Sequence, residues 1–353
     1  MVTFVESLIG MGMSGKKHVS LKDLAEELGV SVSTVSRALK DSPEIGEEMR
    51  ERVKKLAGEW NYRPNPFAMS LLKNTPRIIG IIVPDIVTHF YSSIISGISD
   101  VARQNHYSVI ITSSYEQYEL EKQCVEDLVN IRVEGILACI SQETTDYAHF
   151  ESLTMQRVPL VFFDRVCLHS RCSCVVAESG KVATEHFLQH GVKRIGFIGG
   201  ANHLDIVKQR KHGYLDALRQ YQIPIERELI VCGKMTYEEG RGATRKLLAL
   251  PCPPEAILAM NDTLAFAAMK EIKEQGLRIP QDVALIGYTD ELHSNYVEPA
   301  LTAITHQTYE MGVASCNLLL QHLQKTQRPK KVVIPTRLIV RGSSVKQPFS
   351  KIE

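Results

Sequence analysis

The chain has 353 residues but lacks any apolar run of the roughly 18 residues that a membrane-spanning helix needs. It also lacks a surplus of charge: the formal net charge is +1, so a nucleic-acid-binding surface has to be local. The eight cysteines show no framework spacing, and Cys172 and Cys174 have no second pair at zinc spacing. The N-terminal segment places both lysines after its apolar run, the reverse of a secretory signal. We therefore expect a cytoplasmic protein with no metal, no cofactor and no membrane partner.

Motifs of common catalytic sites are missing as well. The sequence contains neither G-x-S-x-G nor a P-loop, and His186 and His190 lack the intervening glutamate of a metalloprotease helix. We interpret these two histidines as side chains on a solvated helix face. The sequence therefore predicts that the chain is not an enzyme.

From about residue 78, short apolar runs alternate with longer amphipathic segments. Strand-like runs occupy 78–83, 109–112, 135–138, 160–163, 195–198, 256–259 and 283–286, and helical patterns include 90–104 and 262–275. Uniformly apolar strands separated by helices predict parallel sheets that are covered on both faces. The predicted strands and helices are too many to pack around one hydrophobic core. We therefore predict two doubly wound parallel-sheet subdomains, with chain crossings near residue 162 and within 288–330.

Polar residues follow several of the predicted strands. They are Pro84-Asp85, Asp164-Arg165, Gly199-Gly200, Asn261-Asp262 and Gly287-Tyr288-Thr289-Asp290. Each of them alone is typical of a turn or a helix N-cap. Ligands of parallel sheets bind at the carboxyl ends of the strands, so the set as a whole predicts a small-molecule site.

The stretch "VSVSTVSRAL", residues 30–39, has low helix propensity yet lies between two helical patterns. A first helix over 21–28 ends at Gly29, and a second begins at Ser31 with Val35 and Leu39 buried. This arrangement is a helix-turn-helix whose outer face carries Val32, Ser33, Ser36, Arg37 and Lys40. Hydroxyl groups can bond phosphate oxygens, Arg37 can reach a guanine bidentately, and no acidic residue lies between 29 and 40. The alternative is a plain three-helix cap on an enzyme.

The segment 61–77 carries Arg63, Lys73 and Arg77 and no acidic residue. Residues 66–73 could form one short helix, which is too short to be stable alone in water. Such a helix could form when two copies pair on DNA, with an apolar side chain wedged into the minor groove. The alternative is an unstructured tether.

The chain resembles the lactose-repressor/galactose-repressor (LacI/GalR) family of bacterial transcription regulators. The resemblance rests on "LKDLAEELGVSVSTVSRAL", "NYRPNPFAMSLL", "IIGIIVPDI", "RIGFIGG", "AMNDTLAFAAM", "GLRIPQDVALIGYTD" and "PTRLIVRGSS", which run in family order from about 19 to 344. It implies a helix-turn-helix domain at 18–62, a hinge helix within 63–76 and a periplasmic-binding-protein-like core at 77–344. Residues 1–17 and 345–353 would be a lead-in and a tail. The family works as a homodimer on palindromic operators in double-stranded DNA.

The resemblance also implies roles for single residues. Val32, Ser33 and Arg37 would face bases, and Ser31, Thr34 and Ser36 would support the DNA backbone. Leu71 would intercalate at the operator centre, Arg210 would contact the effector, and Asn261 and Asp262 match the family's "ND". The chain departs from the family pattern at Met69, Leu72, Met235 and Thr289.

The predicted function is a DNA-binding repressor that is switched by a small-molecule effector. The predicted effector site contains charged side chains, an amide and an aromatic face: Asp85, Phe90, Tyr91, Asp164, Arg210, Asn261 and Asp290. This mixture favours a saccharide or a sugar phosphate, because hydroxyls pair with carboxylates, Asn and Arg while the C–H face of the ring packs on an aromatic. Arg210 slightly favours a phosphorylated or acidic sugar. A purine-responsive regulator and a periplasmic-type sugar receptor without DNA function are the alternatives.

Overall fold

The structure, a computed structural model, describes residues 19–62, 76–167, 172–178, 180–324 and 328–345. The chain divides into two compact units, Met1–Pro76 and Arg77–Glu353. Residues 63–75 of the predicted hinge, Leu71 among them, lie outside the described residues. No helix within the described ranges is long and apolar enough to cross a membrane.

The N-terminal unit contains α1 (Leu21–Leu28), α2 (Val32–Ala38) and α3 (Glu47–Glu59). Ser20 begins α1 with a capping box, in which its hydroxyl accepts from the Asp23 N–H and the Asp23 carboxylate accepts from the Ser20 N–H. Gly29 ends α1 in the left-handed region at φ +65°, which glycine adopts without a steric penalty. The tight reversal at this glycine turns the chain directly into α2.

The three helices share a small apolar core made of Leu24, Ala25, Val35, Ala38, Val53 and Ala57. Val35 is buried as predicted, whereas Leu39 is only partly buried because α2 ends at Ala38 and Leu39 is its C-cap. The predicted helix-turn-helix is therefore confirmed, with Ala38 taking the inner position beside Val35.

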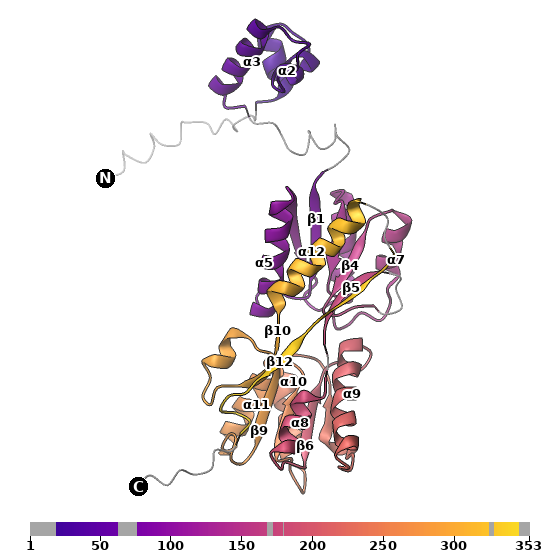
Figure 1. The fold of residues 1–353 in the computed structure, drawn as a ribbon, viewed down its shortest axis with the longest axis vertical. Coiled ribbons are helices and arrows are strands. Elements are labelled where there is room, and N and C mark those ends of the chain that lie inside the picture. The colour runs from indigo at the N-terminus through magenta and orange to yellow at the C-terminus, as the bar shows by residue number, and fades with distance from the viewer. Residues whose placement is uncertain (1–18, 63–75, 168–171, 179, 325–327, 346–353) are drawn as a thin grey trace, which may run out of the picture. The chain divides into compact units, whose positions relative to one another are not determined.

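The second unit is built on two six-stranded sheets within the described residues (Figure 1). The first sheet has the order β11-β5-β4-β3-β1-β2, with β1 (Ile78–Val83), β2 (Ser108–Ser113), β3 (Gly135–Ala138), β4 (Leu160–Phe163), β5 (Ser173–Ala177) and β11 (Lys331–Ile334). The second has the order β12-β10-β9-β8-β6-β7, with β6 (Ile195–Gly199), β7 (Ile230–Cys232), β8 (Ala256–Ala259), β9 (Ala284–Thr289), β10 (Thr302–His306) and β12 (Thr336–Ile339). All strand pairs are parallel except β10 with β12. The prediction of two doubly wound parallel-sheet subdomains is therefore confirmed, with one antiparallel pair at the edge of the second sheet.

Helices cover both faces of the first sheet, as the uniformly apolar strands predict. Ile79 and Ile81 of β1 pack with α5 (His89–Gln104) and α12 (Thr308–Gln324), and Ile78 and Ile82 pack with α6 (Tyr118–Asn130) and α7 (Ala148–Met155). The second subdomain contains α8 (Val182–Gln189), α9 (Asp205–Gln220), α10 (Tyr237–Leu248) and α11 (Asp262–Glu274), with two short 3-10 turns, η1 (Arg227–Leu229) and η2 (Leu292–Asn295).

The chain passes between the two sheets three times within the described residues. The first passage follows β5, between Ala177 and Val182, so the crossing predicted near residue 162 is wrong. The chain crosses later than predicted because β5, which is absent from the predicted strands, is a further strand of the first sheet. The second passage joins β10 to α12 inside the predicted range 288–330, and the third joins β11 to β12 at Pro335.

His186 is also placed differently from the prediction of a solvated helix face. Its side chain is buried, and Nε2 lies 3.0 Å from the Ser344 hydroxyl, while His190 is bonded through Nδ1 to the His186 carbonyl. His186 thus links α8 to the C-terminal segment, whereas His190 is exposed as predicted.

Candidate functional site: a central cavity and a helix-turn-helix face

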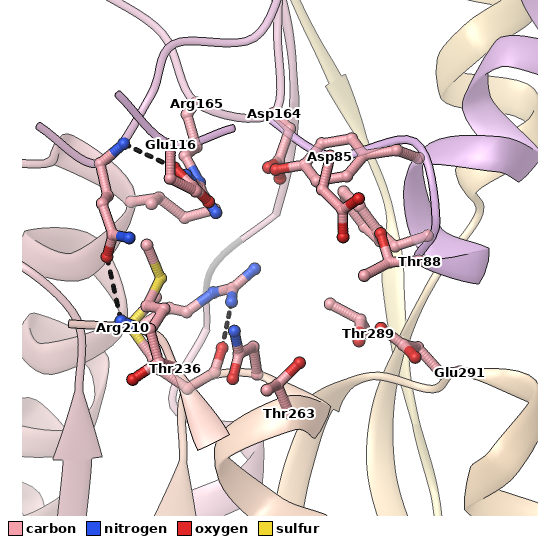
Figure 2. A pocket seen from close by; sticks show the side chains of 17 residues that line it. Asp85, Thr88, Glu116, Asp164, Arg165, Arg210, Thr236, Thr263, Thr289 and Glu291 are labelled. Atoms are coloured by element: carbon pink, nitrogen blue, oxygen red, sulfur yellow. Dashed lines mark hydrogen bonds and ion pairs between the residues drawn. The ribbon is translucent and has the colours of Figure 1, made fainter. Parts of the chain in front are cut away.

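A cavity of about 260 Å³ lies at the carboxyl ends of strands from both sheets; we call it the central cavity (Figure 2). Its volume is close to the lower end of the roughly 300–1,000 Å³ that is typical of ligand pockets. The cavity therefore suits a small metabolite.

All but one of the residues predicted for the effector site line the central cavity: Asp85, Phe90, Tyr91, Asp164, Arg210 and Asn261. Asp290 does not; its carboxylate accepts from Arg341 Nη1 at 2.7 Å. The neighbours Thr289 and Glu291 line the cavity in its place. Thr289 and Asp290 both have positive φ, and this turn directs the Asp290 side chain to Arg341.

Three residues that line the cavity after strand ends have a strained backbone conformation. Glu116, Asp164 and Thr289 all have positive φ, at +62°, +57° and +99°, although none is a glycine. Such conformations cost about 1–3 kcal/mol each and are enriched at ligand sites. The chain thus accepts strain at the positions that aim polar side chains inward (Figure 2).

Asp164 and Arg210 are buried polar side chains with unused hydrogen-bonding groups. Their exposed fractions are 6% and 3%. Asp164 Oδ1 and Arg210 Nε have no hydrogen-bond partner among the described residues. Burial raises the pKa of Asp164 and lowers the pKa of Arg210, and each charge partly offsets the shift of the other. Leaving such groups unpaired costs free energy, so a ligand that pairs with them gains affinity.

Arg210 is held in place by the second subdomain. Nη1 donates to the Met260 carbonyl, Nη2 lies 3.1 Å from His306 Nε2, and the guanidinium lies 4.5 Å from the centre of the Tyr288 ring. Burial and the adjacent Arg210 charge hold the pKa of His306 well below its usual range, so His306 accepts from the arginine as a neutral imidazole.

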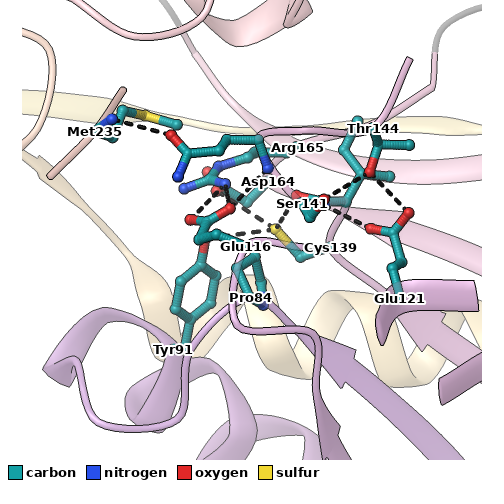
Figure 3. Close-up of polar contacts among 12 residues, drawn as sticks. Pro84, Tyr91, Glu116, Glu121, Cys139, Ser141, Thr144, Asp164, Arg165 and Met235 are labelled. Carbon is teal, nitrogen blue, oxygen red and sulfur yellow. Dashed lines mark hydrogen bonds and ion pairs between the residues drawn. The ribbon is translucent and has the colours of Figure 1, made fainter. Parts of the chain in front are cut away.

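Several lining residues lie outside the predicted set, among them Glu116, Gln142 and Glu291, whereas Arg165 belongs to the predicted strand-end residues. Arg165 Nη1 donates to both Glu116 oxygens at 2.8 Å, and Glu116 also accepts from the Gln142 N–H at 2.7 Å (Figure 3). Glu116 and Gln142 follow β2 and β3, so the carboxyl-end rule would have found them had it been applied to every strand.

Gln142 also joins the two subdomains. Its side-chain oxygen accepts from the Met235 N–H at 3.0 Å, beside an ion pair between Lys234 and Glu143 at 3.5 Å. The buried Glu121 holds the loop that carries Gln142, because its carboxylate accepts from the Ser141 N–H and the Thr144 hydroxyl (Figure 3). One wall of the cavity is therefore continuous across both subdomains.

The outer face of α2 is the second candidate site. Val32, Ser33, Arg37 and Lys40 are exposed, and Thr34 and Ser36 are partly exposed. Ser31 is the N-cap: its hydroxyl accepts from the Thr34 N–H at 3.1 Å and lies 2.7 Å from the Ser33 hydroxyl. The serine content of this helix thus also has a local role, because Ser31 satisfies a free N–H group.

Arg37 is paired with Glu44 at 2.8 Å, with 59% of its own side chain exposed. The sequence pattern of α2 does not reveal this partner, because Glu44 lies beyond the acid-free stretch 29–40. Exposed ion pairs contribute at most about 1 kcal/mol, so the pair leaves Arg37 available to a stronger bidentate partner.

Comparisons with known proteins match both parts of the chain. Residues 20–65 match the family described as bacterial regulatory proteins, lacI family, and residues 184–344 match a periplasmic binding protein-like domain. The chain is 32% identical over 343 residues to the HTH-type transcriptional repressor CytR of Escherichia coli strain K12, covering 94% of this chain and 99% of that protein. This chain belongs to the lacI family.

Solved structures of the lacI family extend the match to the fold. The lac repressor dimer bound to operator and the anti-inducer ONPF superposes with a TM-score of 0.80 at 26% identity, covering 94% of this chain and 100% of that one. A LacI family transcriptional regulator from Enterococcus faecium with bound ribose superposes with a TM-score of 0.67 at 27% identity, covering 77% and 99%. The helix-turn-helix and the two-subdomain core of this lacI-family chain are thus those of its relatives.

The contact between Gln142 and Met235 in this lacI-family chain gives a prediction that needs no ligand. Gln142→Ala removes the acceptor of the Met235 N–H, and a hydrogen bond contributes about 0.5–1.5 kcal/mol. We expect hydrogen exchange at Met235 to be faster by up to about tenfold. Exchange mass spectrometry on a peptide spanning 233–237 measures it.

The matched control is Glu143→Ala, which removes the neighbouring, more exposed ion pair with Lys234. Exchange at Met235 should stay close to that of the unmodified protein in this variant. Unchanged protection of Met235 in Gln142→Ala would show that the side chain does not hold the subdomains together.

Proposed function

We propose that this lacI-family chain is a repressor that binds a palindromic operator as a homodimer and whose operator affinity is changed by a saccharide in the central cavity. The observation that carries the proposal is the cavity itself, in which a buried carboxylate and a buried guanidinium keep unpaired groups. The same chain contains this cavity and a DNA-binding domain. A regulator that is switched by a ligand requires both.

The exposed chemistry of α2 supports base and phosphate recognition. Val32 is 44% exposed and short enough to let the backbone approach the major groove. Hydroxyl side chains beside Val32 can bond phosphate oxygens. The Arg37 guanidinium can donate two hydrogen bonds to the O6 and N7 atoms of a guanine. The lac repressor, whose solved structure is a dimer bound to operator, supports the same arrangement by its similarity.

The lining of the central cavity supports a saccharide. Carboxylates, the Asn261 amide and guanidinium groups provide partners for hydroxyls, and Phe90 and Tyr91 provide apolar rings. The similar Enterococcus faecium regulator holds ribose. A purine would use an aromatic ring and Arg210 but would leave more of the carboxylates without donors.

Replacing Arg37 with alanine tests the DNA part of the proposal. If Arg37 grips a guanine, operator binding should weaken by about 1–3 kcal/mol, and base preference should relax at one position of each half-site. Fluorescence anisotropy on an operator selected from a random pool, compared with unselected DNA, measures both effects.

The control variant is Arg52→Ala, which removes another exposed arginine, from α3. It should leave base preference intact. An equal loss of affinity on selected and unselected DNA in Arg37→Ala would make Arg37 a phosphate contact only.

A further inference from the structure

The charged groups of the central cavity are not balanced. The acidic residues that line it are Asp85, Glu116, Asp164 and Glu291, whereas the basic ones among the described residues are Arg165 and Arg210. His306, which touches Arg210, adds no positive charge because its pKa is held low. Acidic side chains therefore outnumber basic ones around the ligand space.

The two guanidinium groups already have partners. Arg165 is neutralised by both oxygens of Glu116 at 2.8 Å. Arg210 donates to Met260 and His306 and packs on Tyr288, which leaves Nε as its unpartnered buried donor. Both guanidinium groups are therefore already engaged by protein acceptors, which reduces what they offer to a phosphate or a carboxylate.

The carboxylates, in contrast, can still accept hydrogen bonds from a ligand. Among the residues that the structure describes, the buried Asp164 Oδ1 has no partner, and the Cys139 thiol makes a weak contact with Oδ2 at 3.9 Å. Burial raises the pKa of Glu291, and the nearby Asp85 raises it further, against the opposing effect of His293 and His89. An incoming anion would meet these carboxylates where water screens charge poorly.

We propose, resting on the proposed function above, that the effector is an uncharged saccharide and that phosphorylated sugars and uronic acids are rejected. A hydroxyl is both donor and acceptor, so hydroxyls on one ring can donate to Asp164 Oδ1 and accept from Arg210 Nε. A phosphate dianion or a carboxylate that occupies the same point can accept from Arg210 but has no proton to give to the Asp164 carboxylate. The unpaired acceptor and the unpaired donor thus disfavour an anionic group at this point of the cavity.

The test titrates the full chain by calorimetry with matched sets of ligands. They are glucose, galactose and ribose, the phosphate ester of each, the uronic acids of glucose and galactose, and uncharged nucleosides. We expect an uncharged sugar to bind and its own phosphate ester or uronic acid to bind at least about tenfold more weakly. A phosphate ester or uronic acid that binds more tightly than its parent sugar overturns the inference and leaves the saccharide proposal standing. Binding of nucleosides alone overturns the saccharide proposal instead and agrees with rejection of anions.

A second arm needs no sugar and uses inorganic phosphate as the probe. At low concentration and matched ionic strength, phosphate should raise the Tm of the unmodified chain no more than it raises the Tm of Arg210→Ala, a comparison that controls for the general stabilisation of proteins by phosphate. The double variant Asp164→Asn with Glu291→Gln, which removes two of the facing charges, should gain a phosphate-dependent rise in Tm. A phosphate-specific rise in the unmodified chain that disappears in Arg210→Ala would show an anion site and overturn the inference, whatever the sugars do.

Discussion

Replacing Arg210 with alanine should abolish the effect of the saccharide on operator binding while leaving operator affinity without ligand unchanged. Arg210 lies in the lining of the central cavity, and its buried Nε is free for a ligand hydroxyl. The helix-turn-helix belongs to the other compact unit, so the DNA-binding face keeps its residues. Anisotropy titrations of a labelled operator, with and without the saccharide, measure both quantities.

The control for this variant is Arg241→Ala. Arg241 is a partly exposed arginine that pairs with Glu271 and Glu274, away from the cavity lining. Arg210→Ala also leaves the Met260 carbonyl without its donor, at a cost of about 1–3 kcal/mol, so its folding has to be checked by circular dichroism. A folded Arg210→Ala protein with a full saccharide response would remove Arg210 from the effector site.

Replacing Gly312 with alanine should destabilise the core by about 3 kcal/mol or more, at the upper end for overpacked sites. An added Cβ at Gly312 would lie 2.1 Å from the Ile94 carbonyl oxygen, and one at Gly97 would lie 2.2 Å from the Tyr309 carbonyl oxygen. Glycines therefore let α5 and α12 approach until their backbones touch, and backbone atoms cannot rotate out of the way. Denaturant unfolding of the full chain, followed by circular dichroism, measures the change.

Gly242→Ala is the matched control for Gly312→Ala. Gly242 lies inside α10, and an added Cβ there would meet nothing within 4 Å, so alanine should stabilise the helix by up to about 1 kcal/mol. If Gly312→Ala proved as stable as Gly242→Ala, the close approach of α5 and α12 would not limit the packing of the core.

The sequence predicts those parts of the fold that depend on local pattern. The runs 78–83 and 135–138 become β1 and β3 with the same bounds, because strands buried on both faces are uniformly apolar. The predicted set of strands lacks β5 and β10, although these inner strands are buried. It also lacks β7, β11 and β12, which lie at sheet edges and whose residues are mostly exposed or half-buried. An edge strand has too little apolar character to stand out from a loop.

The site was predictable to the extent that strand ends define it. Asp164 and Asn261 follow apolar runs directly and do line the cavity. Asp290 also follows a strand but turns to Arg341, a partner distant in sequence, which no local pattern reveals. The pairing of Glu116 with Arg165 also joins residues that are distant in sequence, so no local pattern reveals it. The surplus of acidic side chains in the cavity becomes visible only in the structure.

The most direct measurement of the central claim is the operator affinity of the full chain with and without a saccharide that calorimetry shows to bind. Coupling between two sites in one protein typically changes affinity by about 5–150-fold, and a change of that size is the predicted result. An operator affinity that stays the same when the central cavity is saturated would contradict the account, because binding and switching would then be separate properties of the chain.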